Sequence, residues 1–297
     1  MISPALNSRR EGLRQESFMP YTVGIDVGST YAKALILSDD FFIVGKAMAH
    51  TGFKLAEISR TLFDRSLEQA GLADSDVTYV VATGFGRHMV PFSNVAVTDL
   101  TASARGTAFL FPNTRTVLDV GGQTMKASRL DETAKVRSFR LNDKCAAGTG
   151  AFIEKTARYM GYSTEEIGPL VATSKMAVPI SGVCAVFAES EVINQLSMGA
   201  PPADIMHGAI SSLVDRSVQL MKRVQMKPEY TLIGGILRFG TMARVVREKL
   251  NTEVNVPEGE MVQYTTALGA AILGHQRLRK LRDTGVEVSR VMQRVAG

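Results

Sequence analysis

Two stretches of this 297-residue chain share one pattern: GIDVGSTYAK at residues 24–33 and TVLDVGGQTMK at residues 116–126. In each stretch an apolar run ends at an aspartate, Asp26 or Asp119, and a glycine-containing turn leads into a second apolar run. Apolar runs joined in this way predict antiparallel hairpins. A third strand-like run follows each hairpin. The repetition therefore predicts two duplicated half-domains.

The segments around the two hairpins predict a mixture of helices and strands. Apolar spacing predicts a helix at residues 55–71 with Gly71 as its cap, and VTYVVATGFGR predicts a strand that ends in a glycine loop. Further helices are expected at 101–111, within 149–226, and from about 265 onward, with strands near 230 and 253. Mixed sheets with helices packed around them favour a two-lobed α/β architecture. The expected division is a polar extension (1–19), a first lobe (20–115) and a second lobe (116–297), with the C-terminal helix returning to the first lobe.

Composition excludes several classes of protein. The chain is 45% hydrophobic and 21% charged with a formal net charge of +5, and its basic residues are spread out, so a nucleic-acid partner is not expected. No run approaches 18 apolar residues, so no membrane span is expected. Two cysteines and no apolar leader argue against a disulfide framework and for a reducing cytoplasm. The four histidines show no ligand spacing and are expected on the surface or in loops.

The first glycine turn has the chemistry of a phosphate site. Consecutive backbone N–H groups around Gly28 bind phosphate oxygens with little obstruction from side chains. Ser29 and Thr30 add hydroxyl donors, and Lys33 adds a positive counter-charge. An aspartate at the end of the strand, Asp26, suits a Mg²⁺ ion that is held mainly through water and substrate phosphates.

Two more glycine pairs extend this nucleotide-site hypothesis. Gly121 and Gly122, followed by Gln123, form a second turn that would face the first if the halves are related by a pseudo-twofold axis. Gly234 and Gly235 follow an apolar strand and would let a flat ligand approach the backbone. Each pair alone is also typical of an ordinary tight hairpin. Three at these separations favour nucleotide binding.

Both cysteines come directly before helix-like segments. Cys145 precedes AAGTGAFIEKTARYMG, and Cys184 precedes AVFAESEVINQLSMG. A thiol at a helix N-terminus has a lowered pKa, which suits a metal ligand or a nucleophile. Buried small hydrophobes are the structural alternative. Two thiolates cannot complete a Cys₄ iron–sulfur site, but two chains related by a twofold axis can; a shared zinc site is also chemically possible.

Four motifs resemble those of the acetate kinase–sugar kinase–Hsp70–actin superfamily. GIDVGSTYAK and TVLDVGGQTMK are similar to its two phosphate motifs, LIGGILRFG (232–240) to its adenosine motif, and TALGAAILG (266–274) to its second connecting motif. The resemblance implies an actin-like ATPase fold of two ribonuclease H-like lobes with ATP in the cleft between them. It implies that Asp26 and Asp119 organise Mg²⁺ and the attacking water, with Gln123 as a further catalytic candidate. The glycine turns would hold phosphates, and Gly234 and Gly235 would face the adenosine.

The cysteine segments narrow the resemblance. NDKCAAGTGAFIE (142–154), ISGVCAVFAESEVI (180–193) and ATGFGR (82–87) resemble the ATP-dependent activators of 2-hydroxyacyl-CoA dehydratases and the ATPase subunits of benzoyl-CoA reductases. The resemblance spans about residues 21–275. It implies a [4Fe–4S] cluster bridging two subunits, with Cys145 and Cys184 of each as ligands. It also implies that ATP hydrolysis drives electrons from ferredoxin to a CoA-ester reductase or dehydratase.

One departure distinguishes the branches of this family. The usual second turn reads Gly-Gly-Gln-Asp, whereas Thr124 follows Gln123 here. Because the acidic residue would assist the attacking water, its absence suits a subunit inside a heteromer, and the smaller ATPase subunit of a benzoyl-CoA reductase is the favoured interpretation. A homodimeric activator of a 2-hydroxyacyl-CoA dehydratase is the alternative within the family. A sugar-kinase-like phosphotransferase is the alternative from another class. The second ATPase chain is accordingly a related subunit or another copy of this one.

Overall fold

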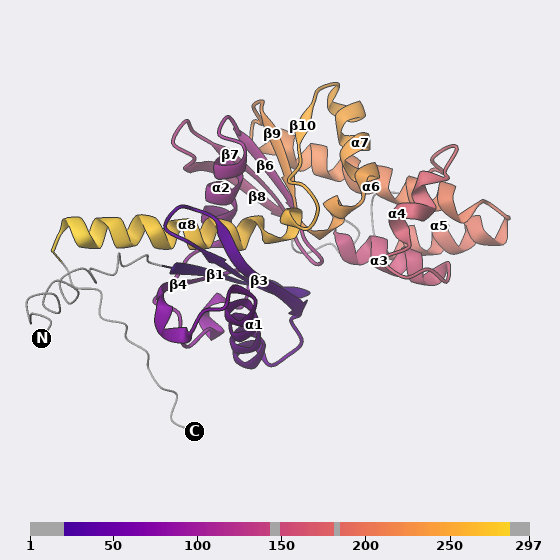
Figure 1. The fold of residues 1–297 in the computed structure, drawn as a ribbon. Helices are drawn as coiled ribbons and strands as arrows, with labels where there is room; N and C mark the ends of the chain where they lie inside the picture. The colour runs from indigo at the N-terminus through magenta and orange to yellow at the C-terminus, as the bar shows by residue number, and fades with distance from the viewer. Residues whose placement is uncertain (1–20, 143–148, 181–184, 286–297) are drawn as a thin grey trace, which may run out of the picture.

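The computed structural model describes residues 21–142, 149–180 and 185–285. These residues form two five-stranded mixed sheets, with the long helix α8 (Met261–Asp283) running between them in Figure 1. The arrangement confirms the predicted two-lobed α/β fold. The proposed polar extension lies outside the described residues.

The two sheets have the same topology. The first has the strand order β3-β2-β1-β4-β5, and the second has the order β10-β9-β6-β7-β8. In each, the first strand pairs antiparallel with the next and parallel with the fourth. This correspondence confirms the predicted duplication. The strands are β1 (Tyr21–Val27), β2 (Tyr31–Leu37), β3 (Ile43–His50), β4 (Val77–Thr83), β5 (Val95–Ala96), β6 (Thr116–Val120), β7 (Met125–Leu130), β8 (Val136–Asn142), β9 (Tyr230–Ile233) and β10 (Val254–Asn255).

Helix α1 (Leu55–Ala70) covers one face of the first sheet. Its apolar residues recur at helical spacing, and Leu62, Phe63 and Leu67 are buried against the sheet. The helix ends where Gly71 adopts a left-handed conformation with φ of 65°. Glycine takes this conformation without a side-chain penalty, so the predicted helix and its cap are confirmed.

Two helices lie between the sheets and pack against each other. Helix α8 covers the other face of the first sheet, and α2 (Asp99–Leu110) packs on the second sheet. Glycines permit these close contacts: a Cβ added to Gly269 of α8 would lie 1.8 Å from the carbonyl oxygen of Ala102 in α2. A Cβ on Gly24 of β1 would lie equally close to the carbonyl oxygen of Ala267. Backbone therefore packs directly on backbone at the junction of the lobes.

The second lobe carries most of the remaining helices. Helix α6 (Pro202–Arg223) covers the outer face of its sheet through a large apolar core that includes Leu213 and Val214. Figure 1 shows α3 to α5 extending away from the sheets beyond α6. The predicted helix-rich segment is thus confirmed. The further helices are α3 (Gly150–Tyr159), α4 (Ile167–Ala172), α5 (Ala185–Ser197), α7 (Gly240–Leu250), and short 3₁₀ turns at Asp74–Asp76, Arg87–Met89 and Gly235–Arg238.

The expected position of one histidine is wrong. His275 lies within α8 and is only 2% exposed. Its Nε2 lies 3.3 Å from the carbonyl oxygen of Leu37, and its ring packs beside that of Phe41. His275 was expected at the surface because the histidines show no spacing typical of metal ligands. It is buried because α8 packs across the first sheet.

Candidate functional site

A cleft of about 510 Å³ lies between the lobes, where the hairpin turns of the two sheets converge. It is lined by all eleven non-cysteine site residues predicted from the sequence: Asp26, Gly28, Ser29, Thr30, Lys33, Asp119, Gly121, Gly122, Gln123, Gly234 and Gly235. These residues come from positions up to about 200 apart in the chain. The fold therefore gathers the predicted nucleotide site into one place, and the role of each residue remains a prediction.

The first turn is a tight hairpin that places Asp26 at the cleft. The Gly28 N–H donates to the carbonyl oxygen of Tyr31 at 3.2 Å, which closes the turn. The carboxylate of Asp26 is 3.2 Å from Lys33 Nζ. The glycine loop after β4 packs against this carboxylate: a Cβ on Gly84, where φ is +87°, would lie 2.5 Å from Asp26 Oδ1. Glycine at position 84 thus gives the Asp26 side chain its room.

The second turn repeats this geometry and meets the first. The Gly121 N–H donates to the carbonyl oxygen of Thr124 at 2.8 Å. A Cβ on Gly122 would lie 2.2 Å from the Oγ1 of Thr30, so the two turns approach closely across the cleft. Both turns therefore lie at the same part of the cleft, as expected if they hold one chain of phosphates.

Helix α3 begins on the second turn. The N–H groups of Gly150 and Ala151 donate to the carbonyl oxygens of Gly121 and Gly122, at 3.0 Å and 2.7 Å. The first N–H groups of a helix have no partner within the helix, and here the turn supplies it. A shift of the second turn would therefore be transmitted to the N-terminal end of α3.

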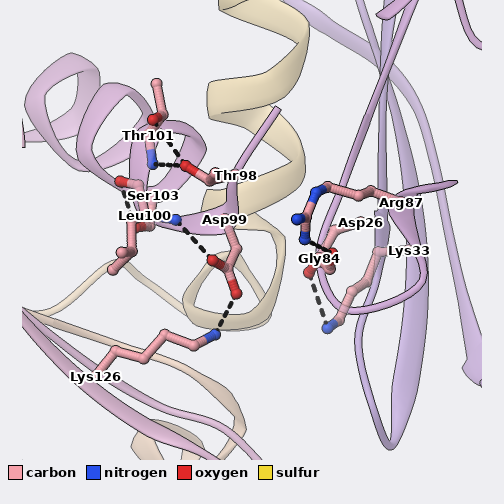
Figure 2. Close-up of polar contacts among 10 residues, drawn as sticks. All are labelled: Asp26, Lys33, Gly84, Arg87, Thr98, Asp99, Leu100, Thr101, Ser103 and Lys126. Carbon is pink, nitrogen blue, oxygen red and sulfur yellow. Dashed lines mark hydrogen bonds and ion pairs between the residues drawn. The ribbon is translucent and has the colours of Figure 1, made fainter. Parts of the chain in front are cut away.

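Two cleft residues that the sequence reasoning missed form an ion pair. Lys126 of β7 pairs with Asp99, the first residue of α2, and both line the cleft (Figure 2). Lys126 carries a recognisable signal, because it follows Asp119 by seven residues, as Lys33 follows Asp26. Asp99 carries no such signal, since only the packing of α2 on the second sheet brings it here.

Asp119, the aspartate of the second hairpin, has a raised pKa. Burial raises the pKa of Asp119, and the nearby Lys126 ammonium opposes this rise. Burial alone would lower the pKa of Lys126, but the carboxylates of Asp119 and Asp99 raise it. The amine therefore remains protonated and supplies positive charge beside the second turn.

The third glycine pair forms the far end of the cleft. Gly234 has a φ of +103°, and a Cβ there would lie 2.2 Å from the carbonyl oxygen of Val120. Its N–H donates to the carbonyl oxygen of Val262 at 2.8 Å, which ties this loop to the start of α8. Gln263 is 7% exposed and lines this end of the cleft; its Oε1 has no hydrogen-bond partner among the described residues. Further lining residues that the sequence reasoning missed are Tyr31, Glu154, Arg238, Phe239 and Thr266.

The predicted cluster ligands Cys145 and Cys184 lie outside the described residues. The backbone next to them is described: α3 begins at Gly150, and α5 begins at Ala185, directly after Cys184. Lys155 of α3 bonds Glu189 of α5 at 2.6 Å, and this ion pair ties the two helices together. Within residues 21–142, 149–180 and 185–285, no group of three or more histidine, cysteine or acidic residues could hold a metal ion.

The protein has two half-domains of the same topology, and each contributes an aspartate–glycine turn to the cleft between them. This is the architecture of the actin-like ATPases, and the protein is of that class. The chain belongs to the BadF/BadG/BcrA/BcrD ATPase family, whose profile matches residues 23–274. The family resemblance drawn from the motifs is thereby confirmed. In the described residues no helix is long and apolar enough to cross a membrane.

Relatives of known role lie in both branches of this family. The chain is 38% identical over 252 residues to the 2-hydroxyisocaproyl-CoA dehydratase activator of Clostridioides difficile, covering 85% of this chain and 94% of that protein. It is 33% identical over 285 residues to one of the benzoyl-CoA reductase subunits of Thauera aromatica, covering 90% and 97%. A solved structure of the activator of the 2-hydroxyisocaproyl-CoA dehydratase from Clostridium difficile with bound ADPNP is 35% identical. It covers 91% of this chain and 99% of that one, with a TM-score of 0.84.

Proposed function

We propose that this chain uses ATP hydrolysis to drive low-potential electrons from ferredoxin to a CoA-ester enzyme, through a [4Fe–4S] cluster shared with a second ATPase chain. The observation that best supports this proposal is the pair of hydrogen bonds from the N–H groups of Gly150 and Ala151 to carbonyl oxygens of the second turn. They join the nucleotide cleft to the helix that follows Cys145. A change of nucleotide at the turn therefore has a direct mechanical route to the segment that carries this thiol.

Different residues of the cleft would bind the nucleotide and promote its hydrolysis. The N–H groups of Gly28 and Gly121 close the two turns, and the N–H groups that follow them, including that of Gly122, would bind phosphate oxygens. Asp26 and Asp119 would hold the water shell of Mg²⁺ and orient the attacking water, with Gln123 beside them. Gly234 and Gly235 would admit the adenosine. ATP hydrolysis relies on positioning and charge stabilisation of this kind more than on covalent chemistry by the protein.

The thiol set fits a shared cluster. The two cysteines of this chain, Cys145 and Cys184, would become four across a twofold axis, the number that a [4Fe–4S] cluster takes. When bound, the cluster supplies a one-electron carrier whose potential depends on hydrogen bonding and exposure. About 59 mV changes a one-electron equilibrium tenfold, so a rearrangement of α3 and α5 that shifts the potential by this amount would favour transfer.

Two partners are candidates. Higher identity to a dehydratase activator than to a benzoyl-CoA reductase chain, 38% against 33%, favours a 2-hydroxyacyl-CoA dehydratase. The threonine at position 124 favours the second candidate, a benzoyl-CoA reductase, in which a related ATPase subunit would compensate for the missing acid. Sequence similarity over nearly the whole chain outweighs one substituted residue, so the activator is placed first.

Anaerobic purification of this chain expressed alone tests the proposal, with iron, sulfide and native mass determined together. About four irons per dimer are expected. The iron should be lost in Cys145→Ala and in Cys184→Ala and kept in Ser197→Ala, at the other end of α5. An iron-free dimer that hydrolyses ATP whatever its partner would contradict the cluster proposal.

Co-expression then separates the two partners. An iron-containing homodimer that reduces a purified 2-hydroxyacyl-CoA dehydratase in an ATP-dependent manner supports the activator role. A monomer that gains iron only with a related ATPase chain, and reduces benzoyl-CoA reductase catalytic subunits, supports the reductase role.

A further inference from the structure

Lys126 occupies a repeated position in its hairpin, but its side chain has a different partner. Asp26 lies opposite Lys33 in the first hairpin, and Asp119 lies opposite Lys126 in the second. Lys33 bonds the aspartate opposite it, whereas Lys126 bonds Asp99. Within the described part of the chain, no ion pair joins Lys126 to Asp119. The two hairpins thus have the same backbone pairing, but Lys126 forms its ion pair with a different aspartate from the one opposite it.

The new partner lies at the start of α2, directly after a segment whose backbone is hydrogen-bonded to the first sheet. Asp99 is the third residue after β5 of the first sheet, and Val97 between them donates its N–H to the carbonyl oxygen of Ala82 in β4 at 2.9 Å. Asp99 Oδ1 also accepts from the N–H of Leu100 at 2.9 Å. Since Lys126 lies in β7, the ion pair joins the second sheet to the segment that connects β5 to α2 (Figure 2).

The setting makes this pair responsive to an anion. The side chain of Lys126 is 17% exposed and that of Asp99 is 23% exposed, and both face the cleft rather than bulk solvent. A lysine ammonium on its flexible stem can change partners without a change in the backbone. A phosphate carries more negative charge than a carboxylate and offers three acceptor oxygens, so it competes well for the amine.

We infer that Lys126 exchanges Asp99 for the terminal phosphate of ATP, so that ATP breaks the Lys126–Asp99 ion pair and ADP leaves it intact. The inference rests on the proposed binding of nucleotide in this cleft. It assigns Lys126 as the residue that distinguishes a triphosphate from a diphosphate. Asp99 is a positioning residue that holds the amine in the absence of the terminal phosphate.

If Asp99 and the terminal phosphate compete for Lys126, substitutions of Lys126 and Asp99 should change the affinity for the triphosphate in opposite directions. Lys126→Met removes the cation and weakens binding of the triphosphate selectively. Asp99→Asn removes the competing charge, keeps an oxygen for the N–H of Leu100, and strengthens binding of the triphosphate. A lysine with a purely structural role would give losses in both variants and for both nucleotides.

Calorimetric titration with the Mg²⁺ complexes of ADPNP and ADP measures this selectivity without turnover. Lys126→Met should lose roughly 10- to 100-fold in affinity for ADPNP, the value of a hydrogen bond to a charged group, with a change of less than about threefold for ADP. Asp99→Asn should bind ADPNP more tightly and leave ADP unchanged. Lys126→Arg keeps the charge and should retain most of the preference for ADPNP, even if Lys126→Met is unstable. Lys54→Met, in a surface pair with Glu57, is the matched control and should change neither affinity.

The outcomes separate this inference from the proposed function. Equal losses for both nucleotides in Lys126→Met, or weaker ADPNP binding in Asp99→Asn, would overturn the assignment of Lys126 and leave the ATPase proposal standing. A wild-type chain that binds neither nucleotide would overturn both.

Discussion

Thr30 and Gly122 meet across the nucleotide cleft: a Cβ on Gly122 would lie 2.2 Å from the Oγ1 of Thr30 and 3.0 Å from its Cβ. The two residues belong to equivalent turns of the duplicated halves. Because the approach involves Cβ as well as Oγ1, rotation of the threonine alone does not make room. The spacing of the two turns therefore depends on a glycine at position 122.

Gly122→Ala should separate the turns and weaken nucleotide binding. We expect affinity for ADPNP to fall at least roughly tenfold, since a loss of about 1.4 kcal/mol of contact is tenfold in Kd. Overpacking should also cost about 1–3 kcal/mol of unfolding free energy. Calorimetry and chemical denaturation measure the two effects. Gly240→Ala, where an added Cβ meets nothing within 4 Å, is the control. Unchanged affinity in Gly122→Ala would show that the turns do not act together.

Gly269→Ala should destabilise the junction of α2 and α8. The added Cβ would lie 1.8 Å from the carbonyl oxygen of Ala102, a backbone atom that cannot swing aside. We expect a loss of at least about 3 kcal/mol in the free energy of unfolding, at or above the upper end for overpacked cores. Urea denaturation followed by circular dichroism measures it, again against Gly240→Ala. A loss below about 1 kcal/mol would mean that the helices separate readily.

The pH dependence of ATP hydrolysis should report on Asp119. Because burial raises its pKa, the carboxyl keeps its proton to a higher pH than an ordinary aspartate, and kcat/KM should fall on the acid side earlier than expected for one. Lys126 lowers the pKa of Asp119, so Lys126→Met should move this acid limb to still higher pH. Asp119→Asn should abolish the limb along with most activity. An acid limb that does not move in Lys126→Met would mean that another group controls it.

The buried His275 should make the fold less stable in acid. Burial lowers its pKa in the folded state, while the packed Leu37 carbonyl and the nearby Asp39 oppose this effect and Arg279 adds to it. The unfolded chain therefore binds more protons. As pH falls below about 6.5, the free energy of unfolding should drop by up to about 1.4 kcal/mol per pH unit until the folded-state pKa is reached.

His275→Gln should flatten this dependence while keeping a donor for the Leu37 carbonyl. Denaturant unfolding from about pH 5 to about pH 8 measures the slope. His207, whose pKa is also lowered by burial and then by Arg244, provides the comparison in His207→Gln. If His275→Gln keeps the wild-type slope and His207→Gln loses it, the buried histidine of α8 is not responsible.

The site was predictable where its chemistry is local in the chain. Asp26 and Lys33 face each other across one hairpin, and the same spacing recurs at Asp119 and Lys126, so one short motif carries strand, turn and charge together. Asp99 was not predictable, because it reaches the cleft through the packing of α2 on a sheet that begins 17 residues later. Gln263 was not predictable either, since it lies at the start of α8, which follows all the strands in sequence and reaches the cleft only through tertiary packing.

The sequence by itself determined the duplicated hairpins, the glycine turns and the helix that ends at Gly71, because each depends on residues within one turn or one strand pair. Tertiary structure alone decided the burial of His275, the meeting of Thr30 with Gly122, and the redirection of Lys126 to Asp99. Each of these depends on how two separately formed lobes pack around α2 and α8. The physical reason is that local backbone preferences act over a few residues, whereas contact between the halves depends on backbone packing at a few glycines far apart in the chain.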